Sequence, residues 1–167
     1  MWEKIKVNFQ NRPSQMKIAR KMIELGLRVD DDKSVYCGDL KITDVYLAKT
    51  VDVDRRIVKF TIETILNSEY LSGIFKNIVP AGTLLKNIAK NLSLGVVEIE
   101  TDRDNYGILA EASRILFLRK INIRQAYAND KDMDGFPILT IITEVPVPGD
   151  IFNELLSIKG ITKVSIY

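Results

Sequence analysis

The stretch VVEIETDRDNYGILAEASRILFLRKINIRQAY, residues 96–127, decides the fold of the second half of the chain, because its hydrophobic period changes twice. Apolar and polar side chains alternate at first, as in a half-buried strand. From Gly107 to Lys120 the apolar residues follow helical spacing, and alternation returns at Ile121. The stretch therefore predicts a strand, a helix and a second strand, with a sharp corner at Asn105-Tyr106-Gly107.

The remaining residues of this half complete the pattern. Residues 137–145 predict a third strand, after a polar turn at 130–135, and their β-branched content favours a central position in a sheet. Residues 148–150 open a second helix that Gly160 ends, and residues 161–167 predict a fourth strand. The order β-α-β-β-α-β with right-handed crossovers predicts a ferredoxin-like α+β fold, with both helices on one face of an antiparallel sheet. The other face needs cover, so pairing with another copy is expected.

The first half of the chain has a different pattern. Ser14 is predicted to cap a helix that Gly26 ends. Two short β-prone runs, residues 27–29 and 35–36, flank an Asp-rich turn and predict a small hairpin. The turn residues 30–32 favour a solvated turn over a cation site, because no glycine and distant glutamate complete a calcium loop.

Residues 43–66 predict two helices joined by a very short turn. Thr43 is a suitable N-cap for the first helix, and Asp52 or Asp54 for the second. Because only residues 51–53 separate them, the helices must cross steeply, as in a helix-turn-helix. The pattern resembles that of bacterial and archaeal transcription regulators. Asp52 stands where such turns usually have glycine, and aspartate tolerates the left-handed backbone better than most residues.

The exposed face of the second helix is expected to present Arg55, Arg56, Lys59 and Glu63. Arg55 and Arg56 lie near its N-terminus, where a recognition helix enters the major groove and contacts phosphates or guanine edges. The candidate DNA contacts are therefore Arg55, Arg56 and Lys59. The alternative is that these are ordinary solvated charges on a helix that only packs.

Composition narrows the function classes. The chain has 24 Lys and Arg against 22 Asp and Glu, a balance that by itself argues neither for nor against binding of nucleic acid. It has no histidine, which excludes a His-based triad and disfavours most zinc sites. Cys37 is the only cysteine, which excludes an internal disulfide framework and fits a reducing, cytoplasmic compartment. No phosphate loop, nucleophile elbow or membrane-spanning apolar run is found, so we expect no enzyme, metal or cofactor.

Charge and pattern suggest three segments. Residues 1–67 hold 13 basic and 10 acidic side chains, whereas residues 93–167 hold 8 basic and 11 acidic ones. We expect a helix-turn-helix-like module over 1–67, a helical connector over 68–92 and the ferredoxin-like domain over 93–167. Thr83 is predicted to cap a helix within the connector, which is too apolar for a free linker.

The corner and its flanks resemble the ACT domain. That family usually has Asp-x-Pro-Gly-hydrophobic-Leu, then a helix and a strand beginning Ile-Asn/Asp-Ile. Here residues 104–109 read DNYGIL, with Tyr106 where proline is commonest, and residues 121–123 read INI. The resemblance covers about residues 94–167. The whole chain, with its YCGDLKI, VDRRIV and ITKVSIY segments, is similar to archaeal ACT-domain regulators of amino-acid metabolism.

The resemblance implies an amino acid bound between two subunits, where this corner faces a strand of the partner. Gly107 lets the backbone approach a ligand and leaves N–H groups at a helix N-terminus that favour a carboxylate. Asp104 is then expected to pair with the ammonium group of the bound amino acid, and Asn122 to hydrogen-bond its ammonium or its carboxylate group. The candidate ligand contacts are Asp104, Asn105, Tyr106, Gly107, Ile108 and Asn122. The alternative is that Gly107 only permits a tight turn, with Asp104 or Asn105 as a cap.

The sequence therefore predicts a ligand-responsive regulator of amino-acid metabolism that forms a homodimer or a higher homo-oligomer. Its ACT domains are expected to bind an amino acid and to tune DNA binding by the front module. A second hypothesis is a non-catalytic allosteric subunit of an amino-acid biosynthetic enzyme, docked through its front helices. A third is an assembly module that has lost its ligand.

Overall fold

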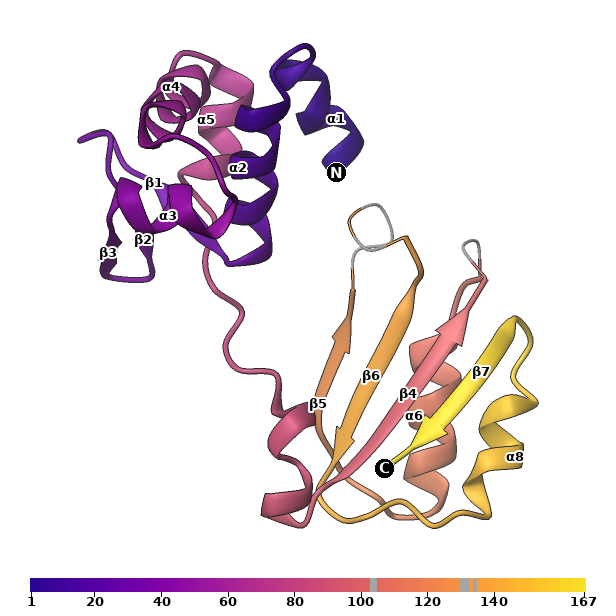
Figure 1. Ribbon diagram of the computed structural model, residues 1–167. Coiled ribbons are helices and arrows are strands. Elements are labelled where there is room, and N and C mark those ends of the chain that lie inside the picture. The colour runs from indigo at the N-terminus through magenta and orange to yellow at the C-terminus, as the bar shows by residue number, and fades with distance from the viewer. Residues whose placement is uncertain (103–104, 130–132, 134) are drawn as a thin grey trace. The chain divides into compact units, whose positions relative to one another are not determined.

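The chain folds into two compact units, Met1–Gly82 and Thr83–Tyr167, shown in Figure 1. The structure, a computed structural model, describes residues 1–102, 105–129, 133 and 135–167. The expected α+β class is confirmed, with a helical first unit and a ferredoxin-like second unit. The segment expected as a connector, 68–92, is divided between the two units.

Helices dominate the first unit. Their bounds are α1 Trp2–Lys6, the 3₁₀ turn η1 Val7–Phe9, α2 Pro13–Glu24, α3 Asp44–Thr50, α4 Arg55–Leu66 and α5 Glu69–Phe75. The prediction that Ser14 caps α2 is wrong, because the helix already begins at Pro13, with Arg12 in the N-cap position. Proline suits the first helical position, since its fixed φ matches the helix and its missing N–H would have no partner there.

One hydrophobic core holds these helices together. α4 packs against α2, α3 and α5, and α5 also packs against the first strand of a small sheet. The large side chains that are almost fully buried in this unit are Ile5, Phe9, Ile18, Met22, Leu47, Ile62, Ile65, Leu71 and Phe75. Because α5 contributes Leu71 and Phe75 to this core, it belongs to the first unit.

The small sheet contains three antiparallel strands in the order β1-β2-β3, namely Leu27–Val29, Val35–Cys37 and Leu40–Ile42. The predicted hairpin corresponds to β1 and β2, and β3 was not foreseen. In the intervening turn, Asp30 accepts a 2.8 Å hydrogen bond from Arg28, and Asp32 accepts one of 2.9 Å from the backbone N–H of Ser34. These bonds lower the pKa of both carboxyl groups, as expected of a solvated, self-bonded turn.

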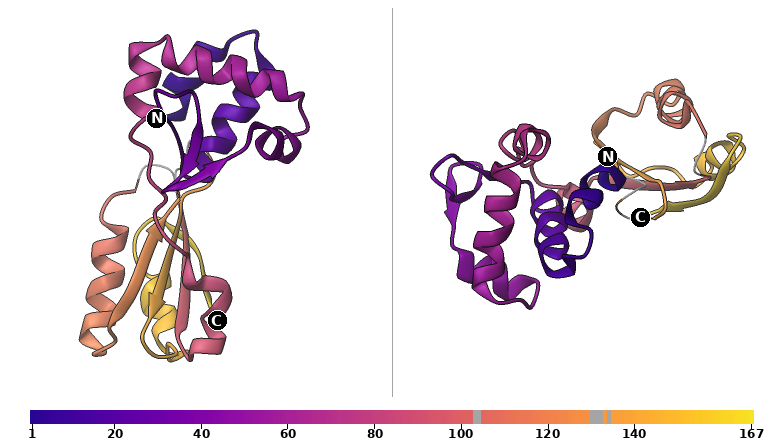
Figure 2. Two further views of the ribbon diagram at one scale, coloured as in Figure 1. Left: turned by 90° about the vertical axis from the view of Figure 1, so that its left-hand side faces the viewer. Right: turned by 90° about the horizontal axis from the view of Figure 1, so that it is seen from above.

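A four-stranded antiparallel sheet forms the second unit, with the order β5-β6-β4-β7. The elements are η2 Leu85–Ile88, η3 Lys90–Leu92, β4 Gly95–Thr101, α6 Ile108–Leu118, β5 Ile123–Ala128, β6 Ile138–Thr143, α8 Ile151–Leu156 and β7 Ile161–Ile166. β6 lies between β5 and β4, so its predicted central position is confirmed. The right-hand view of Figure 2 shows α6 and α8 on one side of the sheet.

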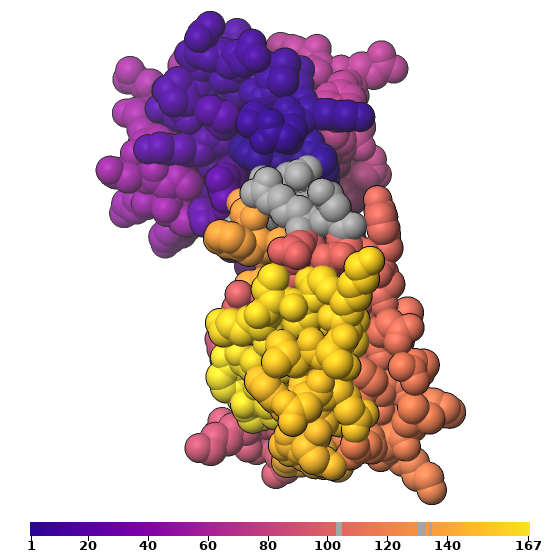
Figure 3. Space-filling model, turned by 90° about the vertical axis from the view of Figure 1, so that its right-hand side faces the viewer, coloured from indigo at the N-terminus to yellow at the C-terminus, as the bar shows by residue number. Residues whose placement is uncertain are grey.

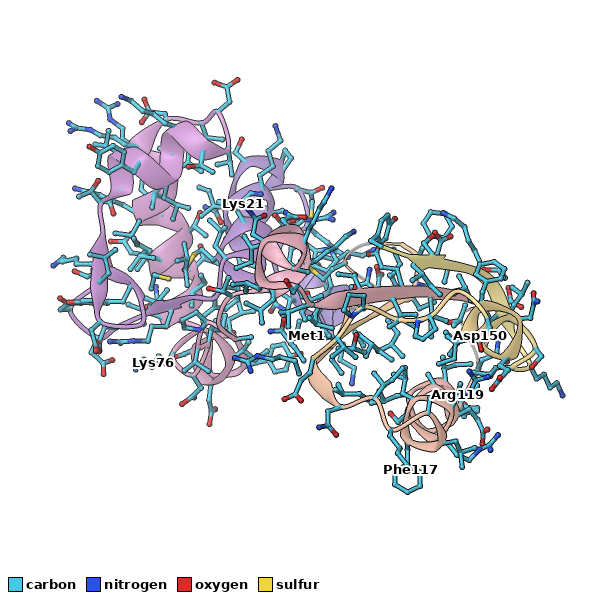
Figure 4. The ribbon with its side chains drawn as sticks, turned by 90° about the horizontal axis from the view of Figure 1, so that it is seen from below. Met1, Lys21, Lys76, Phe117, Arg119 and Asp150 are labelled. Atoms are coloured by element: carbon cyan, nitrogen blue, oxygen red, sulfur yellow. The ribbon has the colours of Figure 1, made fainter. Side chains whose placement is uncertain are left out.

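The main core of this unit lies between the sheet and those two helices. Its most buried members are Val97, Ile99, Ala112, Leu116, Ile141, Ile151 and Leu155. Figure 3 shows the outer surface that α6, α8 and β7 form over it. Arg119, just after α6, donates a 2.7 Å hydrogen bond to Asp150 and also pairs with Glu154 of α8; Figure 4 shows Arg119 and Asp150 near each other.

The chain itself covers part of the other sheet face, which was expected to need a second copy. The 3₁₀ turns η2 and η3 bring Ala89 against Val96 and Ile142. Gln125 of β5 holds the segment that leads into η2. Its Nε2 donates to the carbonyl of Thr83 and its Oε1 accepts from the N–H of Leu85, each at 3.0 Å. The prediction that Thr83 caps a helix is wrong, because the next element is the 3₁₀ turn η2, which begins at Leu85 with Leu84 in its N-cap position. Among the described residues, no helix is both long and apolar enough to span a bilayer.

Candidate functional sites

The turn between α3 and α4 has the predicted helix-turn-helix form. Asp52 adopts the left-handed conformation, with φ of 54°, and the next N–H, that of Val53, donates a 3.1 Å bond back to Ala48 at the end of α3. Asp54, rather than Asp52, caps α4, since its carboxylate accepts a 2.8 Å bond from the N–H of Arg56. Aspartate tolerates this left-handed backbone, so Asp52 can occupy the turn position where glycine is usual.

Burial decides which face of α4 is free. Val58, Ile62 and Ile65 are buried in the core, and Ala48 of α3 is buried beside them. A small residue here lets the two helices approach closely. The opposite side of α4 consequently faces solvent, as the amphipathic spacing requires.

Arg55, Arg56 and Lys59 all lie exposed on that free side. Within the described parts of the chain, none of the three forms an ion pair, in contrast to Lys33, which pairs with Glu63 at 3.2 Å. Two arginines at the start of a helix also sit at the positive end of its dipole, an unfavourable position worth about 0.3–1 kcal/mol per charge. The side chains are thus placed to gain from an anionic partner.

Acidic groups limit this positive face. A hollow of about 360 Å³ beside α4 is lined by Lys33, Asp44, Lys59 and Glu63. Phe60, on the same helix, is 53% exposed. The face therefore combines free cations with one exposed aromatic ring and two nearby carboxylates.

At the other candidate site, Gly107 occupies the N-cap position of α6 with a left-handed φ of 80°. A Cβ built on this glycine would meet nothing within 4 Å, so the backbone conformation rather than packing calls for glycine. The first N–H groups of α6 have no acceptor within the helix. The corner is thus open beside a helix N-terminus.

Asn105 is fixed by a distant turn. Its Nδ2 donates a 3.2 Å hydrogen bond to the carbonyl of Gly160, which also accepts a 3.1 Å bond from the N–H of Asp102. A Cβ on Gly160 would lie 2.1 Å from the Asn105 side chain. Sequence reasoning recognised Gly160 only as the end of a helix, since 55 residues separate the pair.

A cavity of about 230 Å³ opens beside this corner, between the start of α6 and the far end of β5. Its wall includes Asn105, Ile108, Leu109, Ala128, Asn129 and Leu139. Two predicted ligand contacts, Asn105 and Ile108, thus line the same cavity, whereas Gly107, between them in the sequence, does not line it.

The other predicted contacts lie elsewhere. Tyr106 is 96% exposed and lines a separate hollow with residues of α8. Asn122 follows the opposite end of α6, which is about 16 Å long at 1.5 Å per residue, and it donates a 3.1 Å bond to Glu144. Asp104 lies outside the described residues. Within one chain, Asn122 therefore does not join Asn105 and Gly107.

No protein-family model matches the chain, and no curated protein matches it. Among solved structures, the ACT domain of GTP pyrophosphokinase from Chlorobium tepidum is similar over 44% of this chain and 96% of that domain, with 20% identity and a TM-score of 0.35. An AsnC-family transcriptional regulator from Agrobacterium tumefaciens is similar over 92% of this chain and 86% of that one, with 17% identity and a TM-score of 0.28. E. coli AsnC is similar over 93% and 89%, with 10% identity and a TM-score of 0.27. All three scores are below 0.5, so the fold of each unit is assigned from its own strand order and packing.

Proposed function

We propose that the chain is a ligand-responsive, non-enzymatic transcription regulator of the cytoplasm. The first unit binds DNA through Arg55, Arg56 and Lys59 of α4. The second unit binds an amino acid at the Gly107 corner, at an interface between two copies. The observation that carries this proposal is the set of cations at the start of the second helix of a helix-turn-helix, none of which forms an ion pair with another described residue.

DNA supplies what the α4 face lacks. Phosphates provide negative charge at the positive end of the helix, and they relieve the repulsion between Arg55, Arg56 and the helix dipole. Arginine can also hydrogen-bond bidentately to guanine in the major groove, which gives sequence preference as well as affinity. A two-fold dimer reads two half-sites about 34 Å apart, or a multiple of that spacing.

Two copies can unite the separated ligand contacts. β5 is an edge strand whose side chains are mostly exposed, and such an edge can pair with the same strand of a second copy. In an antiparallel pair centred on β5, Ile123 stands opposite Ala128 of the partner subunit. Asn122 then comes beside Asn129 of the partner subunit, at the wall of the cavity that holds Asn105. The ligand thereby bridges both copies, and binding tunes DNA affinity by favouring one dimer geometry.

The DNA half of the proposal is tested by fluorescence anisotropy with a labelled duplex long enough for two half-sites. Affinity of the full chain should fall steeply as salt rises, because phosphate contacts release counterions. Arg55→Ala/Arg56→Ala should weaken binding and reduce the slope of log K against log salt by roughly 2, since each contact contributes about 0.9.

A charge-matched control is Lys4→Ala/Lys17→Ala, which removes two exposed cations from α1 and α2. It should leave both affinity and slope close to those of the unmodified chain. Equal losses in both double variants would mean that general charge, rather than α4, drives binding. No measurable binding at low salt would rule out the DNA-binding role.

A second candidate function is docking to an enzyme of amino-acid biosynthesis, and the exposed ring of Phe60 is the observation that favours it. Large aromatic side chains are enriched at protein interfaces. Phe60→Ala should then abolish binding to the partner enzyme and leave DNA affinity unchanged, whereas Arg55→Ala/Arg56→Ala should do the reverse if α4 binds DNA.

A further inference from the structure

The cavity beside Gly107 has walls that are mostly hydrocarbon. Ile108 and Leu109 line it from α6, and Ala128 and Leu139 line it from β5 and β6. Ile108 and Leu139 are 9% and 7% exposed, so these walls are fixed parts of the core, whereas Leu109 is 48% exposed at the opening. Among the described lining residues, none carries a charge.

Three polar side chains of the described residues line it, of which Asn105 and Asn129 are hydrogen-bonded within the chain and Thr101 adds a hydroxyl group. Asn129 uses both ends of its amide, since Nδ2 donates to Phe136 at 2.9 Å and Oδ1 accepts from Ile138 at 2.6 Å. Asn105 also lines the cavity, and its Nδ2 is committed to the carbonyl of Gly160, whereas its Oδ1 accepts no hydrogen bond from the described residues. Asn105 and Thr101 thus offer oxygen acceptors for an ammonium group, and the described lining residues offer no cation or carboxylate to a charged side chain.

We propose that this cavity takes the side chain of an aliphatic amino acid, such as leucine, isoleucine or valine. This inference rests on the proposed amino-acid site and specifies its ligand class. A charged side chain placed here would lose hydration without gaining a charged partner among the described lining residues, which opposes binding. A cavity of about 230 Å³ is below the usual size for drug-sized ligands, about 300–1,000 Å³, and suits a small aliphatic group.

The test is calorimetric titration of the full chain with L-leucine, L-isoleucine, L-valine, L-aspartate and L-lysine. The aliphatic amino acids should bind, and aspartate and lysine should bind at least about 100-fold more weakly, since a charge without a partner is excluded from such a site. Tighter binding of aspartate or lysine than of leucine would overturn the aliphatic assignment while leaving an amino-acid site in place.

A matched pair of variants locates the site. Leu109→Asn makes the opening of the cavity polar, and Leu118→Asn makes the same change on the same helix at a side chain that is 62% exposed and does not line the cavity. Leucine affinity should fall about 10-fold or more in the first and stay unchanged in the second. Equal effects of both variants would place the ligand elsewhere. If none of the five amino acids binds, the inference and the ligand half of the proposed function both fail, whereas the DNA half is decided separately by the salt dependence.

Discussion

The side chain of Asn105 hydrogen-bonds the carbonyl of Gly160 at 3.2 Å, and this bond joins the corner before α6 to the turn before β7. The contact is possible only because residue 160 has no side chain, and its φ of 87° is also one that glycine adopts readily. The shape of the candidate ligand site therefore depends on a residue far from it in the sequence.

Gly160→Ala should destabilise the second unit, because the new Cβ meets Asn105 and the left-handed backbone by itself costs about 1–2 kcal/mol for an ordinary residue. The matched control is Gly107→Ala, which carries the same backbone penalty at φ of 80° but has open space around the new Cβ. Hydrogen exchange of β4 and β7 amides measures the loss. Asn105→Ala should partly rescue Gly160→Ala and not Gly107→Ala, and equal effects on both would contradict the steric explanation.

Asp54→Ala should destabilise the first unit by about 0.5–2 kcal/mol, the usual cost of removing an N-cap. Trp2 is the only tryptophan and is buried in this unit, so its fluorescence in urea follows the unfolding of this unit. Asp54→Asn keeps an oxygen acceptor for the N–H of Arg56 and should be nearly neutral. A loss as large in Asp54→Asn as in Asp54→Ala would show that charge, rather than the cap bond, matters.

Gln125→Ala should release the segment that begins at Thr83 from the sheet, because two hydrogen bonds to its backbone are lost, each worth about 0.5–1.5 kcal/mol at this exposed to half-buried position. Trypsin should then cut faster at Lys86 and Lys90, which lie in η2 and η3. Arg124→Ala, at the exposed neighbouring position, is the control. Unchanged cleavage in Gln125→Ala would mean that the apolar contacts alone hold the segment.

The pKa of Asp150 should respond to Arg119. The hydrogen bond from Arg119 lowers the pKa of this carboxyl below its ordinary 3.8 in the folded chain. Its contribution to stability is therefore complete above the unfolded pKa and is lost as pH falls through the lower folded pKa. An NMR titration of Asp150 should give a midpoint below 3.8 that rises in Arg119→Gln; an unchanged midpoint would exclude the ion pair as the cause.

Strongly periodic segments made the fold predictable. The order of elements in the second unit and the crossing of α3 and α4 both follow from hydrophobic spacing and short connections. β3 was missed because three residues with lysine at the centre show no distinct period. The N-cap predicted at Ser14 was wrong because Pro13, one residue earlier, is the better first helical residue.

The candidate sites were predictable only in part, and for a physical reason. The exposure of Arg55, Arg56 and Lys59 was foreseen because an amphipathic helix shows its exposed face in its own sequence. Contacts between residues far apart in the sequence leave no such local trace. The hydrogen bond from Asn105 to Gly160 spans 55 residues. The hydrogen bonds of Gln125 with Thr83 and Leu85 span 42 and 40 residues, and only the fold reveals these contacts.

The most direct test of the central claim is whether an aliphatic amino acid changes DNA affinity. Anisotropy titrations of the full chain with the labelled duplex, with and without saturating L-leucine, measure the coupling between the two sites. We expect a change in affinity of at least about fivefold, lost in Leu109→Asn, and an equal change in leucine affinity when DNA is present. If leucine binds and DNA affinity is the same with and without it, the two units do not form a ligand-controlled regulator.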